Sequence, residues 1–263
     1  MTAERLSRLA AAVVPPVLFS VFVTLVWQGA VILFEIQPYL LPGPVDVAHA
    51  VGTHLQALLS AAALTAQAAL SGFMLSFVVG FLVAVVFSQS RLAERSLYPY
   101  AIFLQTVPIV AVAPLIVLWI GHGLVGVVAV AFIISLFPII ANTTAGLTSV
   151  DGELLDLFAL NEASRWQVLT KLQVPHAVPA MLTGARISCG LSVIGALVGE
   201  FFCGYGTEDR GLGILISMTS AQTKTPYLFA SVLFSTALGL LFFGVVAGLS
   251  YKALDRWGGR EQD

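Results

Sequence analysis

A stretch of 55 residues, from Ser96 to Val150, contains no charged side chain. The hydrocarbon core of a bilayer is about 30 Å thick and takes roughly 20 apolar helical residues to cross. The stretch is therefore long enough for two transmembrane helices. Only 10% of the chain is charged, whereas an ordinary soluble domain has about 25% charged residues. This composition excludes a soluble enzyme and a disordered scaffold, and the net charge of −2 provides no strong basic field to attract nucleic acid.

Six segments are predicted to span the membrane. Residues 9–34 form the first, and Gly121-His122-Gly123 divides the long uncharged stretch into spans at about 99–120 and 124–146. Residues 47–69 are more polar and are predicted to form a helix at the outer surface. Pro108 and Pro114 are expected to break or bend the third span. The remaining spans are predicted at about 70–87, 183–203 and 226–251.

Lysine and arginine gather in the segments of one side, which predicts the orientation of the chain. With the N-terminus inside, only Arg210 and Lys224 fall in outer segments. Both termini are therefore predicted to be cytoplasmic. The inner segments hold the other ten basic residues, which are Arg5, Arg8, Arg91, Arg95, Arg165, Lys171, Arg186, Lys252, Arg256 and Arg260.

The inner connection between the fourth and fifth spans, about 147–182, is predicted to be ordered. Asp151 is a favourable N-cap for a helix through 154–158. The sequence Ser164-Arg165-Trp166-Gln167 fits a capping box at the start of a second helix, and Pro175 and Pro179 are expected to end it. Two short amphipathic helices result. They either pack on lipid and on the chain's own spans, or form a docking platform for a cytoplasmic partner.

This connection resembles the EAA loop of type I ABC-importer permeases. The family pattern is EAA, three residues, Gly, nine residues, Ile, one residue and Leu-Pro. Counting back from Pro175 places the triplet at Asp156-Leu157-Phe158, the glycine at Glu162, and the Ile and Leu at Leu172 and Val174. The spacing matches while the identities differ. Because Glu162 replaces the glycine, Asn161 is expected to take the left-handed conformation of the turn.

The resemblance extends over nearly the whole chain. Residues 39–44, Tyr-Leu-Leu-Pro-Gly-Pro, are similar to the element that follows the first span in permeases of the nitrate, sulfonate and taurine group. That group also includes importers of hydroxymethylpyrimidine-type vitamin precursors. Further similar segments are Leu70-Ser71-Gly72-Phe73, residues 114–121, Phe137-Pro138-Ile139 and Gly211-Leu212-Gly213.

The resemblance implies an all-α, multi-span permease in the bacterial plasma (inner) membrane, with residues 1–263 forming one transmembrane domain. It implies a pore made by two permease subunits, either identical or different. Two separate ATPase subunits that bind ATP and Mg²⁺, and an extracytoplasmic substrate-binding protein, complete the importer. The chain has no G-x-x-x-x-G-K-[ST] phosphate-binding loop. We therefore expect no cofactor in this chain and no enzymatic activity of its own.

The resemblance places the ATPase-docking residues in the inner connection. An exposed tryptophan beside an arginine is typical of a binding hot spot, although Trp166 could instead anchor at the membrane interface beside a positive-inside Arg165. Asp156 and Glu162 either pair with partner cations or are simply solvated. The predicted docking residues are Asp156, Leu157, Phe158, Asn161, Glu162, Ser164, Arg165, Trp166, Gln167 and Pro175.

Polar residues within the spans are candidates for the translocation path. Glu200 is the most notable, because an ionisable residue in a span is costly and is by default a functional candidate. It could line the path, pair with Arg210 or a second subunit, or reach headgroups and water. The other candidates either line an aqueous path or bond between helices, and they are Gln105, Thr106, Asn142 and Thr143. The four histidines lack metal-ligand spacing, so no metal site is predicted.

Three functions remain in competition. An importer permease would work by alternating access, driven by ATPase subunits that move the inner connection. An ATP-independent secondary transporter or channel should show inverted repeats or paired buried charges, and neither is visible in the sequence. A membrane-embedded enzyme would need a cluster of catalytic side chains at a membrane face. The solute stays open between nitrate, sulfonates, taurine and pyrimidine-type precursors.

Overall fold

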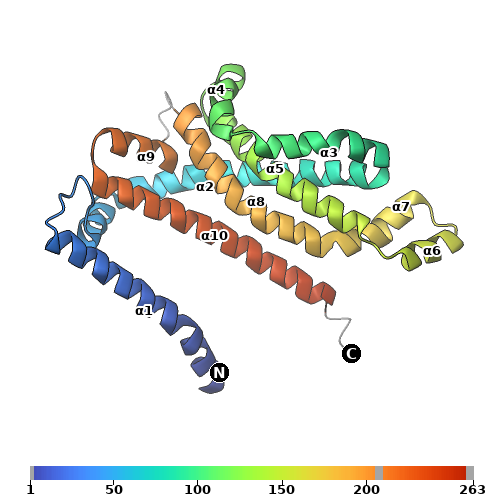
Figure 1. The fold of residues 1–263 in the computed structure, drawn as a ribbon, viewed down its shortest axis with the longest axis horizontal. Coiled ribbons are helices and arrows are strands. Elements are labelled where there is room, and N and C mark those ends of the chain that lie inside the picture. The colour runs from blue at the N-terminus through green and yellow to red at the C-terminus, as the bar shows by residue number, and fades with distance from the viewer. Residues whose placement is uncertain (1–2, 205–209, 259–263) are drawn as a thin grey trace. The chain divides into compact units, whose positions relative to one another are not determined.

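The computed structural model describes residues 3–204 and 210–258, and these are almost entirely helical (Figure 1). They form two compact units. The first unit contains residues up to Leu59 together with Leu215–Leu233. The second contains Ser60–Ile214 and the chain from Phe234 onward. Arg260, one of the basic residues assigned to the inner side, lies outside the described residues.

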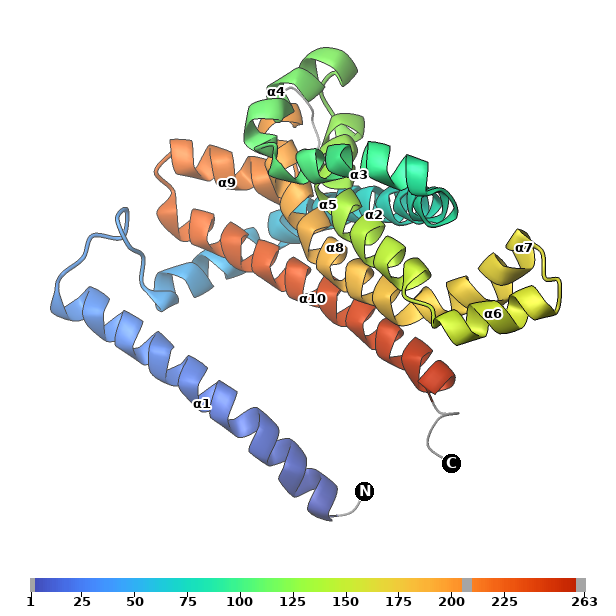
Figure 2. The same cartoon turned by 45° about the vertical axis from the view of Figure 1, so that its right-hand side comes forward.

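The described part of the chain contains helices and no strand, as expected for an all-α membrane protein. Figure 2 follows them along the chain. They are α1 (Ala3–Leu33), α2 (Pro44–Gln89), α3 (Arg91–Thr106), α4 (Ile109–Ile120), α5 (Leu124–Thr148), α6 (Gly152–Leu160), α7 (Arg165–Val168), the π-helix η1 (Leu169–Gln173), α8 (Val174–Cys203), α9 (Leu212–Ala221) and α10 (Thr225–Gly258).

Five of the described helical segments are long and apolar enough to cross a membrane, which confirms the multi-span fold. The third expected span, 99–120, is instead divided into α3 and α4, neither of which qualifies. Val107 and Pro108 are both extended between them, with φ/ψ of −68°/123° and −66°/107°. Proline has no N–H and disfavours the helical conformation of the residue before it. The five spans are Val14–Leu33, Pro44–Gln89, Leu124–Thr148, Arg165–Cys203 and Thr225–Asp255.

Two other boundaries differ from the sequence predictions. The expected surface helix at 47–69 and the span at 70–87 are parts of one helix, α2, which departs from helical geometry only at His54, where φ/ψ is −114°/18°. Pro175 and Pro179 do not end a helix, because Pro175 lies in the first turn of α8 and Pro179 lies inside it. Pro175 directly follows the π-helix η1, in which the Val174 N–H bonds to the Leu169 carbonyl and the α-helical bonding pattern is already interrupted.

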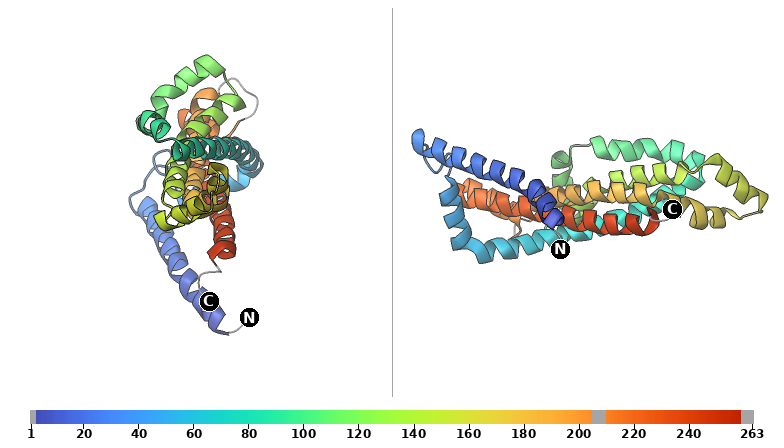
Figure 3. Two further views of the ribbon diagram at one scale, coloured as in Figure 1. Left: turned by 90° about the vertical axis from the view of Figure 1, so that its right-hand side faces the viewer. Right: turned by 90° about the horizontal axis from the view of Figure 1, so that it is seen from below.

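The second unit is built around α5 and α8, which run side by side in Figures 1 and 2 and in the right-hand view of Figure 3. Small residues let the two backbones approach: a Cβ on Gly195 would lie 2.7 Å from the Ala131 Cα. Hydroxyl groups add bonds between helices. The Ser76 and Ser135 Oγ atoms are 2.6 Å apart, and Ser188 donates to the Ser135 carbonyl at 2.6 Å. Small residues and hydroxyl bonds are the usual means of packing helices in a membrane, where lipid removes the hydrophobic drive.

Aromatic stacking and hydrogen bonds join the helices of the first unit. The ring centroids of Trp27 in α1 and Phe229 in α10 are 5.9 Å apart. His54 stacks on Tyr227 with centroids 4.1 Å apart and an interplanar angle of 16°. Thr225 donates to the Tyr39 carbonyl at 2.7 Å. These contacts fix the turn after α1 against the start of α10.

Candidate functional site

The predicted docking residues lie in and next to the segment Asp151–Gln173, which we call the α6–α7 segment. It connects α5 to α8. Its first helix is capped as expected, since Asp151 Oδ1 accepts a hydrogen bond from the Glu153 N–H at 3.1 Å. An aspartate at this position satisfies an orphan N–H and also suits the positive end of the helix dipole. The sequence alone therefore determines where α6 begins.

The capping box predicted at Ser164 is confirmed in both directions. The Gln167 N–H donates to Ser164 Oγ at 3.3 Å, and the Ser164 N–H donates to Gln167 Oε1 at 2.8 Å. The helix that begins there is not short, however. It passes through the π-helix η1 directly into α8, so that Arg165–Cys203 is one helical run of 39 residues.

The turn between α6 and α7 is a Schellman motif centred on Glu162. The Glu162 N–H bonds to the Ala159 carbonyl at 3.0 Å, and the Ala163 N–H bonds to the Phe158 carbonyl at 3.0 Å. These are the two bonds that define the motif, which places a left-handed residue just after the C-cap. Asn161 is that C-cap, with φ −90°, whereas Glu162 has φ +51°. The expectation that Asn161 is left-handed is therefore wrong.

Replacing Glu162 with glycine is expected to stabilise this turn. A non-glycine residue in the left-handed region costs roughly 1–2 kcal/mol, and glycine removes that cost because it has no Cβ. Amide hydrogen exchange in α6 and α7 should slow several-fold in Glu162→Gly. Glu162→Ala is the control, because it removes the carboxylate but keeps a Cβ. Equal exchange in the two variants would mean that the backbone of Glu162 is not strained.

Most apolar side chains of α6, and Trp166 of α7, are exposed, whereas Leu169 of η1 is buried. No residue of α6 is buried. Leu160 is 83% exposed and Trp166 is 70% exposed. Of the predicted docking residues, Phe158 and Pro175 are half-buried, and the others are exposed. Figure 2 shows α6 and α7 beyond the ends of α5 and α8. Exposed apolar residues on ordered helices are typical of surfaces that contact either a protein partner or lipid.

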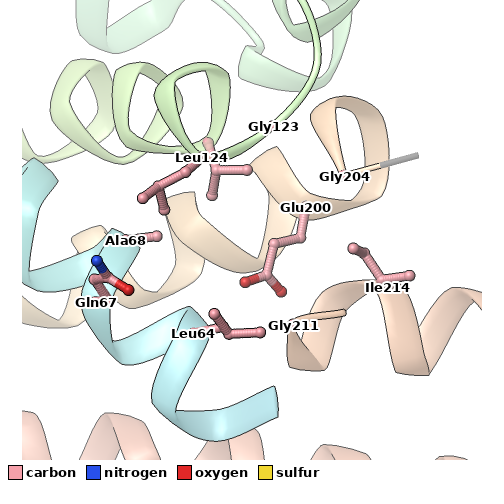
Figure 4. Close-up of a pocket in the computed structure, with 10 residues that line it drawn as sticks. Leu64, Gln67, Ala68, Gly123, Leu124, Glu200, Gly204, Gly211 and Ile214 are labelled. Carbon is pink, nitrogen blue, oxygen red and sulfur yellow. The ribbon is translucent and has the colours of Figure 1, made fainter. Parts of the chain in front are cut away.

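Glu200 occupies a second candidate site, a pocket of ≈ 290 Å³ near the other end of α8 (Figure 4). The side chain is only 4% exposed. Its Oε1 accepts a hydrogen bond from Thr65 Oγ1 at 2.7 Å, and its Oε2 accepts one from the Gly213 N–H at 2.6 Å. Thr65 Oγ1 in turn accepts from the Leu212 N–H at 2.9 Å. A buried carboxylate needs such partners, because burying an unpaired charge is costly.

These bonds hold the N-terminus of α9 against α2 and α8. Leu212 and Gly213 are the first residues of α9, so their N–H groups have no partner within the helix. The carboxylate also faces the positive end of the α9 dipole. Glycine is required for this approach, because a Cβ on Gly211 would collide with the Glu200 carboxylate. A Cβ on Gly213 would lie 2.9 Å from Glu200 Oε2.

The five predicted pathway residues are not brought together. Glu200 lines the pocket of Figure 4, but Gln105, Thr106, Asn142 and Thr143 do not. Gln105 and Thr106 are exposed at the end of α3. Asn142 donates to the Pro138 carbonyl within α5 at 2.8 Å, and Thr143 is fully buried with no partner for its hydroxyl among the described residues. The bonds to Glu200 come from Thr65 and Gly213, rather than from Arg210.

Sequence reasoning missed Thr65 and the pocket residue Gln67. Thr65 is separated from Glu200 by 135 positions. A single threonine in an apolar run usually bonds within its own helix, and Thr65 does lie 3.1 Å from the Ala61 carbonyl. No local pattern indicates the second bond. The glycines at 211 and 213, by contrast, are a visible signal of a close backbone approach.

The chain is similar to several known transport proteins. It is 33% identical over 242 residues to the formylaminopyrimidine transport permease protein ThiX of Halalkalibacterium halodurans, covering 89% of this chain and 92% of the relative. It is 36% identical over 236 residues to the riboflavin transport system permease protein RibX of Chloroflexus aurantiacus, with 88% and 85% covered. A sulfonate-type relative, the putative aliphatic sulfonates transport permease protein SsuC of Bacillus subtilis, is 30% identical over 78% of this chain and 70% of its own length.

One solved structure and one family model point to the same kind of protein as these relatives. The MetNI methionine ABC transporter in an inward-facing conformation matches with a TM-score of 0.65 at 15% identity, over 76% of this chain and 97% of that chain. This match supports the type I ABC importer fold. Residues 76–258 match the family model of binding-protein-dependent transport system inner membrane components. The chain therefore belongs to this family and is an ABC-importer permease.

Proposed function

We propose that this chain is the transmembrane subunit of an ATP-driven importer and that its α6–α7 segment docks the ATPase. The supporting observation is the segment itself: two capped helices with exposed apolar side chains, among them Leu157, Leu160 and Trp166. Order and exposure together are what a docking surface requires, because a pre-organised surface loses little conformational entropy on binding. Trp166 and Arg165 are neighbours at the start of α7 and provide the residue types typical of hot spots.

The helical run Arg165–Cys203 gives this docking surface a mechanical connection to the Glu200 pocket. A run of 39 residues is roughly 60 Å long at 1.5 Å per residue. Trp166 lies at its first turn and Glu200 at its last. In the proposed cycle, ATP binding closes the ATPase dimer and brings the docked segments together, so that α8 tilts as one body. The carboxylate of Glu200 then carries α9 with it, because their bonds join the two helices.

The orientation and partners are part of the same proposal. With ten of twelve basic residues on the inner segments, the α6–α7 segment and both termini face the cytoplasm of a bacterium, and the chain lies in the inner membrane. A second permease subunit, identical or different, completes the pore. Two ATPase subunits hold the ATP and Mg²⁺. An extracytoplasmic binding protein delivers the solute to the side on which Glu200 lies.

We propose a nitrogen heterocycle as the first solute to test. The relatives named above for formylaminopyrimidine and riboflavin cover the largest shares of this chain among the three. Among the described residues, the lining of the Glu200 pocket includes one carboxylate and no cation. Such a lining favours solutes that donate hydrogen bonds over anions such as nitrate or sulfonates. Taurine, which carries both charges, is intermediate.

The docking proposal is tested by purifying the tagged chain from its native membrane and identifying co-purified subunits by mass spectrometry. An ATPase subunit should accompany the wild type. The double variant Arg165→Glu/Trp166→Ala should lose it at least tenfold, because it removes a hot-spot aromatic and reverses a charge. The matched control is Lys252→Glu/Tyr251→Ala in α10. Tyr251 is as exposed as Trp166, at 70%, and it also neighbours a cation.

The outcomes separate the competing functions. Loss in the α7 variant with retention in the α10 variant supports docking at the α6–α7 segment. Equal retention in both would place the ATPase elsewhere and refute the docking assignment. A wild-type chain that is purified alone would favour the alternative function, an ATP-independent secondary transporter or channel. A co-purified binding protein would then be screened with pyrimidine, flavin, sulfonate and nitrate ligands.

A further inference from the structure

A polar cavity of ≈ 400 Å³ lies where several of the candidate spans end. Its walls come from the last turn of α2, the first turns of α3, the C-terminal end of α5 and the π-helix η1. Ser88, Thr148 and Gln173 contribute polar groups from three of these elements. Because α2 and α5 are apolar up to this level, the cavity lies at the boundary between hydrocarbon and water.

The charges around the cavity favour an anion. Arg91 and Arg95 both line it, and they stand four residues apart on α3, so their side chains share one face of the helix. Glu94, which is half-buried, is the only carboxylate among the lining residues in the described part of the chain, so these residues carry one net positive charge. The two arginines are exposed. Guanidinium groups bind phosphate oxygens in a bidentate manner and suit this ligand better than a lysine does.

Exposed apolar side chains lie close in sequence to the residues that line the cavity. Leu82 and Val86 of α2 and Leu97 of α3 are all exposed. They stand within about two turns of the lining residues Phe87 and Arg95 along their helices and can contact acyl chains. Inorganic phosphate would use only the basic part of this arrangement, whereas a phospholipid would use both parts. Basic pockets between transmembrane helices are known to hold anionic head groups.

We propose that this cavity binds the head group of an anionic phospholipid, with Arg91 and Arg95 on its phosphate. The site also includes the end of the α6–α7 segment, because Gln173 of η1 lines the cavity. Gln89 at the end of α2 donates to Gln173 Oε1 at 2.9 Å. A bound head group therefore braces the start of α8 against α2 and α3. The site requires only that the cavity is at head-group level, so it does not depend on the ATPase docking proposed above.

The test uses the full-length chain in nanodiscs made from equal parts of phosphatidylglycerol and phosphatidylcholine. After mild detergent extraction, the lipids that remain bound are counted by native mass spectrometry. The wild type should retain phosphatidylglycerol in preference to phosphatidylcholine. Arg91→Gln/Arg95→Gln should lower this preference by roughly tenfold or more, since each basic residue near the surface strengthens anionic-lipid binding about fivefold. Glu94→Gln should raise it, because it removes the one carboxylate.

Two further variants control for charge and folding. Lys171→Gln/Lys252→Gln removes the same charge from exposed positions outside the cavity lining and should leave the preference unchanged. Arg91→Lys/Arg95→Lys keeps both charges and should retain part of the preference for phosphatidylglycerol. Excess inorganic phosphate should not displace the lipid. The proposal is overturned if phosphate does displace it, if the lysine-to-glutamine control loses as much preference, or if the arginine-to-glutamine variant binds like the wild type.

Discussion

Replacing Glu200 with alanine is expected to free the N-terminus of α9 and to destabilise the protein by about 3 kcal/mol or more. The substitution removes two hydrogen bonds to a charged acceptor, each worth about 1.5–3 kcal/mol. It also leaves the Gly213 N–H unsatisfied in a buried place, whereas Thr65 can still donate to the Ala61 carbonyl. A loss of this size should lower the thermal midpoint of the purified chain by roughly 6–12 °C, since 1 kcal/mol is worth about 2–4 °C at this chain length.

Glu200→Gln is the matched control and should cost much less. Its amide oxygen can accept from the Gly213 N–H while its NH₂ group donates to Thr65 Oγ1. The Thr65 proton then goes to the Ala61 carbonyl, which lies 3.1 Å away. Every hydrogen bond is replaced, and only the attraction between the charge and the α9 dipole is lost, about 0.3–1 kcal/mol. Thermal midpoints measured by size-exclusion chromatography after heating distinguish the variants. If the alanine and glutamine variants melt together, the hydrogen bonds of Glu200 do not hold α9.

A second large effect is expected where α5 and α8 touch. In most helices, replacing glycine with alanine is favourable by about 1 kcal/mol. At Gly195 the sign should be reversed, because the new Cβ would lie 2.7 Å from the Ala131 Cα, a backbone atom that cannot move aside. Forcing the helices apart costs about 1–3 kcal/mol. Gly195→Ala should therefore lower the thermal midpoint by several degrees.

Gly190 lies on the same helix and supplies the control. A Cβ at Gly190 would meet nothing within 4 Å. Gly190→Ala should accordingly leave the thermal midpoint unchanged or raise it slightly. The same melting assay compares both variants. Equal and positive shifts at the two positions would show that the close packing of α5 on α8 is not what limits stability.

Local patterns predict the beginnings of the short helices well. The caps at Asp151 and Ser164 involve residues at most three positions apart, so the sequence alone contains everything that forms them. The turn at Glu162 is mispredicted, although the bonds that form it are equally local. The Schellman bonds determine which residue is left-handed, and here they place it at Glu162. The preference of Asn161 for that conformation is too weak to shift the turn.

Features that depend on tertiary packing are less accessible. The prolines at 108 and 114 predict a break or bend, yet hydropathy alone cannot show that the break at Val107 and Pro108 leaves α3 and α4 too short to span. Glu200 stands out because a carboxylate in an apolar helix is rare. Its partner Thr65 does not, because a threonine in an apolar helix is common. The cavity at Arg91 arises from four separate elements and has no sequence motif.

Site-specific photo-crosslinking in native membranes tests the central claim most directly, namely that the α6–α7 segment is the ATPase-docking surface. A photoreactive amino acid is placed at Leu160, at Trp166, or at the exposed control position Tyr100 on α3. After illumination, adducts are identified by mass spectrometry. We predict an ATPase adduct from positions 160 and 166 and none from position 100. Adducts with lipid alone from positions 160 and 166, in membranes that contain the ATPase, would contradict the account.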